Sequence, residues 1–171
     1  MITFSSKTYL KDVNKYKIAM IIKKDIGICI KKILKIRKPF LLNEDGEIIK
    51  LIDNNYYIVE IVPFDKNYVL IVYLDNNYDV IERYYFMTNS NCVRDGVLAY
   101  QNLKLAYVCT KNNKKMYNQN KLKTMKENMK ISAEIYKKSI NEMNALINEI
   151  NNNTNNLYNM DYQKLIIDGG I

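Results

Sequence analysis

The sequence predicts an α+β fold, in which a mostly antiparallel β-barrel or strongly bent sheet is followed by a short and a long C-terminal α-helix. Two observations support this prediction. Short apolar runs of strand length, rich in Ile, Val, Tyr and Phe, follow one another from residue 17 to residue 117 with no helical pattern between them. After Gln119 the spacing of the apolar residues changes to three and four, which is typical of an α-helix.

The expected strands are separated by turns that rely on Asn and Asp, because the chain has only 5 glycines and 2 prolines. Within one run, alternation places Tyr57, Val59 and Ile61 on the same face of the sheet. The runs are Lys17–Ile22, Ile26–Ile36, Pro39–Leu42, Ile48–Ile52, Tyr56–Val62, Tyr68–Leu74, Val80–Thr88, Val97–Cys109 and Lys115–Tyr117.

Two helices are expected after the strands. Leu122, Met125 and Met129 have the spacing of the short one. Ser132 is the expected N-cap of the longer helix, Ser132–Asn151. Its apolar stripe should pack on the sheet of its own chain or, alternatively, on a protein partner.

The length of 171 residues suits one domain. We expect residues 1–150 to form a single barrel-plus-helices domain and residues 151–171 to form an Asn-rich linker and C-terminal tail. The N-terminus lacks the features of a signal peptide, and no segment approaches the ~18 consecutive apolar residues of a membrane span. The chain is therefore expected to be cytoplasmic and to have no membrane partner.

The amino-acid composition excludes several kinds of catalytic and metal site. The chain contains no histidine, which excludes Ser-His-Asp and Cys-His catalysis and HExxH zinc sites. Its 3 cysteines are far apart and form no CxxC motif, so reduced thiols are expected rather than disulfides. Cys29 and Cys109 lie in apolar runs and are predicted to be buried structural residues.

The net charge of +8 is unevenly distributed along the chain. Residues 1–40 carry 11 basic and 2 acidic residues, and residues 101–130 carry 8 basic and 1 acidic. The intervening segment, residues 41–100, carries 4 basic and 10 acidic residues. Two basic segments can form a patch for phosphate or nucleic acid. The alternative is that AT-rich codon usage enriched lysine without any ligand, and the sequence leaves this open.

The later part of the chain has motifs in a recognisable order: RYYFMTN at residues 83–89, DGVLAYQNLKLAYVCT at residues 95–110, KKMYNQNKLKTM at residues 114–125, and then the long helix. This order resembles the bacterial nucleoside di- and triphosphatases that include the nucleotide hydrolase of fosfomycin biosynthesis, a family long labelled a domain of unknown function. The resemblance covers residues 20–150. It implies a flattened barrel with C-terminal helices and metal-dependent cleavage of a nucleotide phosphoanhydride.

The resemblance also implies which positions would carry the chemistry, and this chain departs from the pattern at each of them. Residues 96–126 contain no Asp or Glu at all. Neutral amides and ammonium groups do not supply the negative charge that a Mg²⁺ or Mn²⁺ site needs. The family's asparagine falls on Met87, its alternate aspartates fall on Asn102, Lys104 and Ala106, and its acidic cluster falls on Asn118, Gln119, Asn120 and Lys121.

We therefore interpret the chain as a catalytically degenerate phosphatase-like domain that acts as a binding or scaffold module, for a ligand that contains phosphate. No catalytic residue, metal or cofactor is assigned. Lysine and amide donors suit phosphate. The candidate phosphate pocket comprises Asn102, Lys104, Asn118, Asn120 and Lys121.

Two other functions stay open. The chain could be an active Mg²⁺- or Mn²⁺-dependent nucleoside di- or triphosphatase with a relocated metal site. It could instead bind RNA through its basic segments and its 15 tyrosines, because exposed aromatic rings stack on bases. The carboxylates available for a relocated metal site are those of Glu60, Asp65, Asp75, Glu82 and Asp95.

Overall fold

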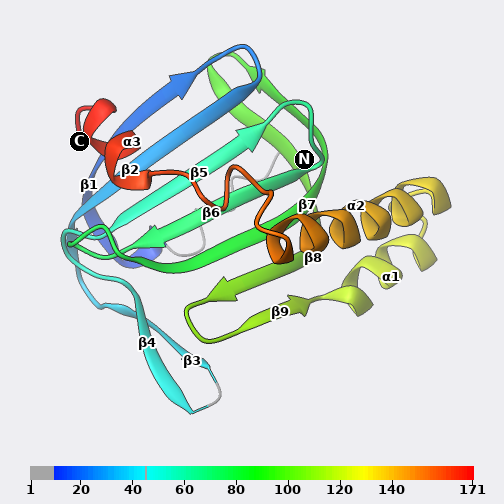
Figure 1. Ribbon diagram of the computed structural model, residues 1–171, viewed down its shortest axis with the longest axis horizontal. Coiled ribbons are helices and arrows are strands. Elements are labelled where there is room, and N and C mark those ends of the chain that lie inside the picture. Colours follow the sequence, from blue (N-terminus) through cyan, green and yellow to red (C-terminus); the bar gives the residue numbers. More distant parts are fainter. Residues whose placement is uncertain (1–9, 45) are drawn as a thin grey trace.

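The structure, a computed structural model, describes residues 10–44 and 46–171 (Figure 1). A short 3₁₀ turn, η2 (Leu10–Asp12), precedes a seven-stranded antiparallel sheet. In the order in which they neighbour one another, its strands are β1 (Val13–Ile22), β2 (Ile26–Ile36), β5 (Tyr57–Pro63), β6 (Tyr68–Leu74), β7 (Val80–Arg94), β8 (Val97–Thr110) and β9 (Lys114–Tyr117).

The remaining two strands, β3 (Phe40–Glu44) and β4 (Glu47–Ile52), form a separate hairpin inserted between β2 and β5. This β3–β4 hairpin projects from one end of the sheet (Figure 1). The runs expected to form strands all do so, and the bounds of β2 and β6 agree with the predicted ones.

The sheet is strongly bent but not closed, so the bent-sheet prediction is confirmed and the closed barrel is wrong. Strands β1 and β9 are its two edges, and within the described residues they do not pair with each other. The bend brings the start of β8 over β2, although three strands separate them in the sheet: a Cβ added to Gly27 would lie 2.1 Å from Cδ2 of Leu98. The absence of a Cβ at Gly27 leaves room for the Leu98 side chain. Two register shifts in the β7–β8 pair supply local bends.

Each face of the sheet has its own core. Three helices cover the first face, which we call the helix-covered face. They are α1 (Gln119–Glu127), α2 (Ala133–Asn151) and α3 (Tyr162–Asp168). Leu122, Met143 and Ile166, one from each helix, are fully buried there. Tyr57, Val59 and Ile61 lie in the same core, so the predicted alternation is confirmed.

The opposite face, which we call the hairpin-covered face, packs against the β3–β4 hairpin. Leu51 and Ile52 of β4 are buried against Ile71 and Phe86 of the sheet. A fully buried side chain of this size contributes about 1.5–3 kcal/mol. The β3–β4 hairpin is therefore anchored to the sheet by Leu51 and Ile52, at the end of β4.

The helices agree with their sequence signals. Ser132 caps α2, because its Oγ accepts a hydrogen bond from the N–H of Ile135 at 3.1 Å. The apolar stripe of α2 packs on the sheet of its own chain, where Met143, Leu146 and Ile150 are buried. None of the helices in the described ranges has both the length and the hydropathy needed to cross a membrane.

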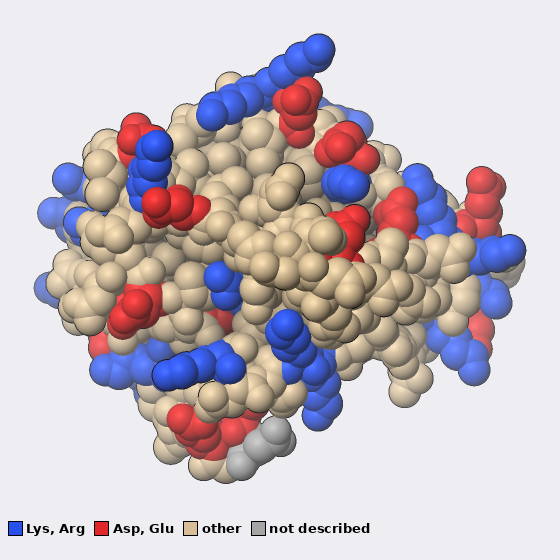
Figure 2. All heavy atoms as spheres, in the orientation of Figure 1, with Lys and Arg blue, Asp and Glu red and all other residues tan. Residues whose placement is uncertain are grey.

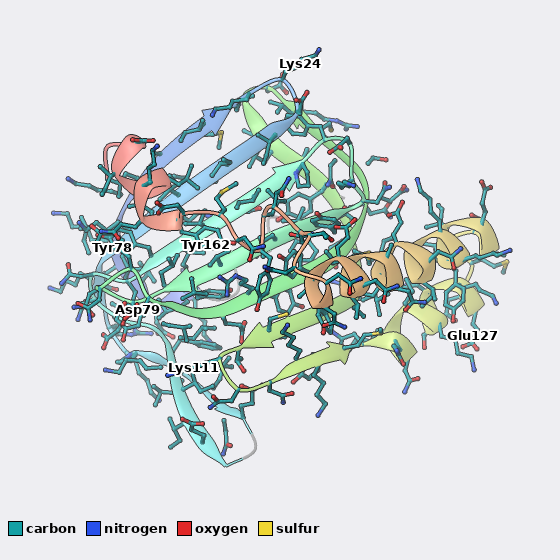
Figure 3. The ribbon with its side chains drawn as sticks, viewed as in Figure 1. Lys24, Tyr78, Asp79, Lys111, Glu127 and Tyr162 are labelled. Carbon is teal, nitrogen blue, oxygen red and sulfur yellow. The ribbon has the colours of Figure 1, made fainter. Side chains whose placement is uncertain are left out.

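Helix α3 was not predicted, because it lies within the segment expected to be linker and tail. Its N-cap is Asp161, whose carboxylate accepts a hydrogen bond from the N–H of Lys164 at 2.9 Å. The preceding Asn-rich stretch contributes Asn155, which is only 3% exposed and whose Nδ2 donates to Oε2 of Glu149 at 2.9 Å. Figure 3 shows Tyr162 of this segment lying over the sheet.

Candidate functional site

A bulge in β8 presents two of the predicted site residues. Phe86 pairs with Ala106 and Thr88 pairs with Asn102, so three residues of β8 face one residue of β7. At the bulge Lys104 adopts a left-handed backbone, with φ of 72°, and its N–H donates to Oδ1 of Asn102 at 2.6 Å. This Asn102 contact closes the bulge and leaves the Lys104 side chain exposed.

The start of α1 carries two more of the predicted site residues, Asn118 and Lys121. Strand β9 pairs with β8 and ends at Tyr117, and Asn118 then turns the chain with φ of 64°. The side chain of Asn118 makes no capping hydrogen bond, so the first N–H groups of α1 have no side-chain cap. Lys121 follows in the first turn, exposed, while Leu122 anchors the helix in the core. No acidic residue lies in that turn. The helix dipole and Lys121 are both positive here.

These residues border one cavity of about 560 Å³, which lies between the β3–β4 hairpin, the hairpin-covered face and the start of α1. We call it the hairpin cavity. Four of the five predicted site residues line it. The full lining is Phe40, Leu42, Asn43, Glu44, Leu51, Ile71, Tyr73, Glu82, Tyr84, Asn102, Lys104, Val108, Tyr117, Asn118 and Lys121.

Four positions implied by the family pattern do not line the hairpin cavity, namely Met87, Ala106, Gln119 and Asn120. Asn120 is exposed on α1 and is not part of the cavity lining, so the structure does not bring it together with the other four. Ala106 is buried in the core of the hairpin-covered face. Met87 is fully buried on the helix-covered face, because it alternates with Phe86 along β7.

The cavity also contains two carboxyl groups that the sequence interpretation did not place there. Glu82 lies on β7, opposite Tyr73 of β6 and Thr110 of β8, and is 7% exposed. Burial, and secondarily the negative charge of Glu44, raises the pKa of Glu82 to about 7. Near neutral pH its carboxyl group is therefore about half protonated, which is unusual for glutamate.

Of the five acids considered for a relocated metal site, only Glu82 lines the hairpin cavity. Glu60 is occupied elsewhere, by Nζ of Lys31 at 3.5 Å and the hydroxyl of Tyr100 at 2.6 Å. Asp75 accepts two backbone N–H groups within its own turn, and Asp65 and Asp95 are exposed. Among the described residues, no three His, Cys, Asp or Glu side chains are grouped so that they could hold a metal ion.

The cysteines agree with the prediction of structural thiols. Cys29 and Cys109 are buried, and neither lines the cavity. Burial raises the pKa of Cys29 and raises that of Cys109 to about 11, so both thiols are protonated near neutral pH.

The basic residues do not form one patch on the face that Figure 2 shows, where Lys and Arg side chains are interspersed with Asp and Glu. Figure 3 labels two residues in turns at one end of the sheet. Lys111, in the β8–β9 turn, and Asp79, in the β6–β7 turn, lie at the end of the sheet from which the β3–β4 hairpin projects. Glu82 follows that β6–β7 turn closely in sequence.

Sequence reasoning missed the aromatic part of the site. Phe40, Tyr73, Tyr84 and Tyr117 line the cavity together with Glu82. One signal was present: Glu82 is an acid within an otherwise apolar strand run, in the alternating position next to Tyr84. A carboxyl group in a buried strand is costly and often functional.

Comparison with family models finds no match, and comparison with curated proteins finds none. Comparison with solved structures finds matches over most of the chain. One is a crystal structure of the phosphatase SC4828 with the non-hydrolysable nucleotide GPCP, with a TM-score of 0.58 and 6% identity, covering 78% of this chain and 72% of that one. Another is the complex of FomD with CDP, with a TM-score of 0.58 and 10% identity, covering 81% of this chain and 77% of that one. The predicted resemblance to these nucleotide phosphatases is thus confirmed at the level of the fold.

Proposed function

We propose that the chain binds a nucleotide, or another phosphorylated ligand, in the hairpin cavity without a metal ion and without hydrolysing it. The observation that carries this proposal is the grouping of Lys104, Lys121, Asn102 and Asn118 around one cavity in a fold shared with two nucleotide-bound proteins. Two ammonium groups and two amides are donors that suit phosphate oxygens. The uncapped start of α1 adds the positive end of a helix dipole.

The same residues argue against a divalent cation at this end of the cavity. Mg²⁺ is held by carboxylates and water in near-ideal octahedral geometry. Of the described acids only Glu44 and Glu82 line the cavity, whereas Lys104 and Lys121 would repel a cation. The lysines thus take the place of metal charge, and binding replaces phosphoryl transfer as the function.

The first test is calorimetric titration with CDP in a metal-free buffer. We expect the wild-type chain to bind, and Lys121→Ala to weaken binding by about tenfold or more, because a hydrogen bond to a charged group contributes about 1.5–3 kcal/mol. Lys104→Ala should have a similar effect. The matched control is Lys123→Ala, which removes an exposed lysine from the same helix that does not line the cavity.

Because the lysine contacts are electrostatic, affinity should also fall as salt rises. Equal affinities for Lys121→Ala and Lys123→Ala would place the ligand elsewhere. Failure of the wild-type chain to bind CDP, CTP or pyrophosphate would end the proposal.

A further inference from the structure

Strand β1 runs along one edge of the sheet (Figure 1), and a row of apolar side chains on it is exposed. Within the described ranges β1 pairs with β2 alone, so its outer edge has no neighbouring strand. The apolar side chains occupy alternate positions and therefore share one face. Single exposed apolar residues are ordinary, whereas a contiguous group marks an interaction site. We call this group the β1 row; it comprises Tyr16, Ile18, Met20 and Ile22, each between 40% and 54% exposed.

The hydrophobic core of the hairpin-covered face ends at β1. Tyr16 pairs with Ile33 of β2, and Met20 pairs with Cys29. The β1 row therefore lies on the same face as these two buried residues of β2. Leu98 of β8 covers β2 on this face, whereas the β1 row is exposed. A strand that paired with β1 would thus extend a core that is already present.

The backbone of β1 directs its outward hydrogen-bonding groups from the same four residues. The N–H of Lys23 donates to the carbonyl of Ile26 at 2.9 Å, which makes these residues a hydrogen-bonded pair beside the β1–β2 turn. Such pairs alternate along an antiparallel ladder, and the register between Tyr16 and Ile22 is regular. The odd-numbered residues 17–21 therefore bond to β2. The N–H and C=O groups of the β1 row point away from it, toward the position of a further strand.

A second copy of β1 matches this edge better than the other edge strand of the sheet does. That strand, β9, has 4 residues, and two of them are Lys114 and Lys115. It therefore matches neither the 10-residue length of β1 nor its apolar row. Another copy of β1 has the same length and the same spacing of apolar side chains.

The β1 row is complementary to itself. In an antiparallel pair of β1 strands centred on Ala19, Tyr16 would lie opposite Ile22 and Ile18 would lie opposite Met20. The two-fold axis would repeat both contacts, so each member of the row would face an apolar side chain. Cross-strand pairs of aromatic and β-branched residues stabilise a sheet.

The charges on the other face of β1 permit this pairing but weaken it at both ends. Lys17 would lie opposite Ile21, so the centre of the pair brings no like charges together. Lys15 would lie opposite Lys23, and both are exposed. Like charges directly opposite each other are destabilising, and salt screens them. The association should therefore strengthen as salt rises, whereas binding of phosphate in the hairpin cavity should weaken.

We propose that two copies of the chain associate through their β1 strands, in an antiparallel pair centred on Ala19, and form one continuous sheet. Each copy contributes the same strand, so the contact closes as a dimer and does not propagate. A 10-residue strand is smaller than the ~20–30 residues that each partner contributes to a standard interface, so the dimer is weak and concentration-dependent. The β1 row does not line the hairpin cavity, and the dimer is independent of the proposed function.

The first test is the average mass of the full chain by analytical ultracentrifugation, over a range of protein and salt concentrations. We expect the mass to rise from that of one chain, 20.2 kDa, toward twice this value, and to rise further at high salt. Ile18→Lys should weaken association by about tenfold or more, because it places like charges within the pair. The matched control is Ile48→Lys, at an exposed position on β4 that should not affect association.

The second test is disulfide formation, which reports the register. In a Cys92→Ser background the remaining cysteines are buried. Ala19→Cys lies on the two-fold axis in a non-hydrogen-bonded pair, whose Cα atoms are ~4.5 Å apart, within the ~4.4–6.8 Å that a disulfide spans. We expect mild oxidation to produce a covalent dimer. Lys17→Cys is the control, because its two copies would lie four residues apart, or ~13 Å along the strands.

A chain that keeps a mass of 20.2 kDa up to about 1 mM would overturn the proposal. Association that Ile18→Lys and Ile48→Lys weaken equally would do the same, because the contact would then lie elsewhere. Equal yields of covalent dimer from Ala19→Cys and Lys17→Cys would also contradict it, because they indicate random collision. If Ile18→Lys does not fold, the comparison of the two cysteine variants decides.

Discussion

Replacing Lys31 with methionine is expected to lower the free energy of unfolding by about 3–5 kcal/mol, because it leaves a buried carboxylate without its counter-charge. Lys31 is 6% exposed and Glu60 is 3% exposed. Nζ of Lys31 lies 3.5 Å from Oε2 of Glu60, and the hydroxyl of Tyr100 donates to Oε1 at 2.6 Å. Together these contacts satisfy both carboxylate oxygens within the core of the hairpin-covered face.

The effect should reach the candidate site through the sheet. Glu60 is on β5 and pairs with Ile71 of β6, which lines the hairpin cavity beside Tyr73. Urea denaturation of the purified variants measures the loss. In Lys31→Met combined with Glu60→Gln, the Gln oxygen still accepts from Tyr100 and no charge is buried, so most of the lost stability should return.

The control for the Lys31 change is Lys123→Met, which breaks the exposed Lys123–Glu127 ion pair on α1. Exposed pairs contribute about 0–1 kcal/mol, so this control should be nearly neutral. If Lys31→Met and Lys123→Met lower the free energy of unfolding by equally small amounts, the Lys31–Glu60 ion pair does not contribute to stability as we expect.

Glu82→Gln is expected to stabilise the fold, by an amount that increases with pH. Burial raises the pKa of Glu82 from 4.5 to about 7. Between these two values the folded chain retains a proton that the unfolded chain has released, so the stability of the wild type falls as pH rises. The loss is complete above about pH 7, where the shift corresponds to about 3 kcal/mol. Glutamine carries no charge and escapes this loss.

Urea denaturation at pH 5, 7 and 9 measures this difference. The variant should exceed the wild type by less than about 1 kcal/mol at pH 5 and by about 3 kcal/mol at pH 9. Glu127→Gln, on the surface, should show no comparable trend. A difference for Glu82→Gln that does not change with pH would mean that Glu82 ionises normally in the folded chain. The stability that the wild type gives up is consistent with an acid retained for a ligand rather than for folding.

Much of the fold could be predicted because its signals are local. Strands β2 and β6 are rich in Ile, Leu and Val and are bounded by turns, and both have the predicted bounds. The sequence could not show whether the sheet would close into a barrel or stay open. Closure depends on the twist accumulated over all the strands and on bulges such as the one at Lys104. Helix α3 was missed because Asn-rich composition dominated the segment, although Asp161 before an apolar run is a helix-start signal.

Part of the candidate site could also be predicted from the sequence, and part could not. The family pattern pointed to Asn102, Lys104, Asn118 and Lys121, and these four lie around one cavity. Glu82 could be seen as an acid in an apolar strand, but its burial depends on the β3–β4 hairpin, which begins some forty residues earlier in the chain. A contact between such distant segments leaves no periodic pattern in the sequence.

The most direct test of metal-free binding without hydrolysis is one experiment with two readouts: calorimetric titration with CDP in EDTA and in Mg²⁺ or Mn²⁺, and phosphate release from CDP and CTP in the same metal-containing samples. We expect binding in EDTA that added metal does not strengthen, and no phosphate release above a protein-free blank. Binding that requires the metal, or metal-dependent turnover, would contradict this account.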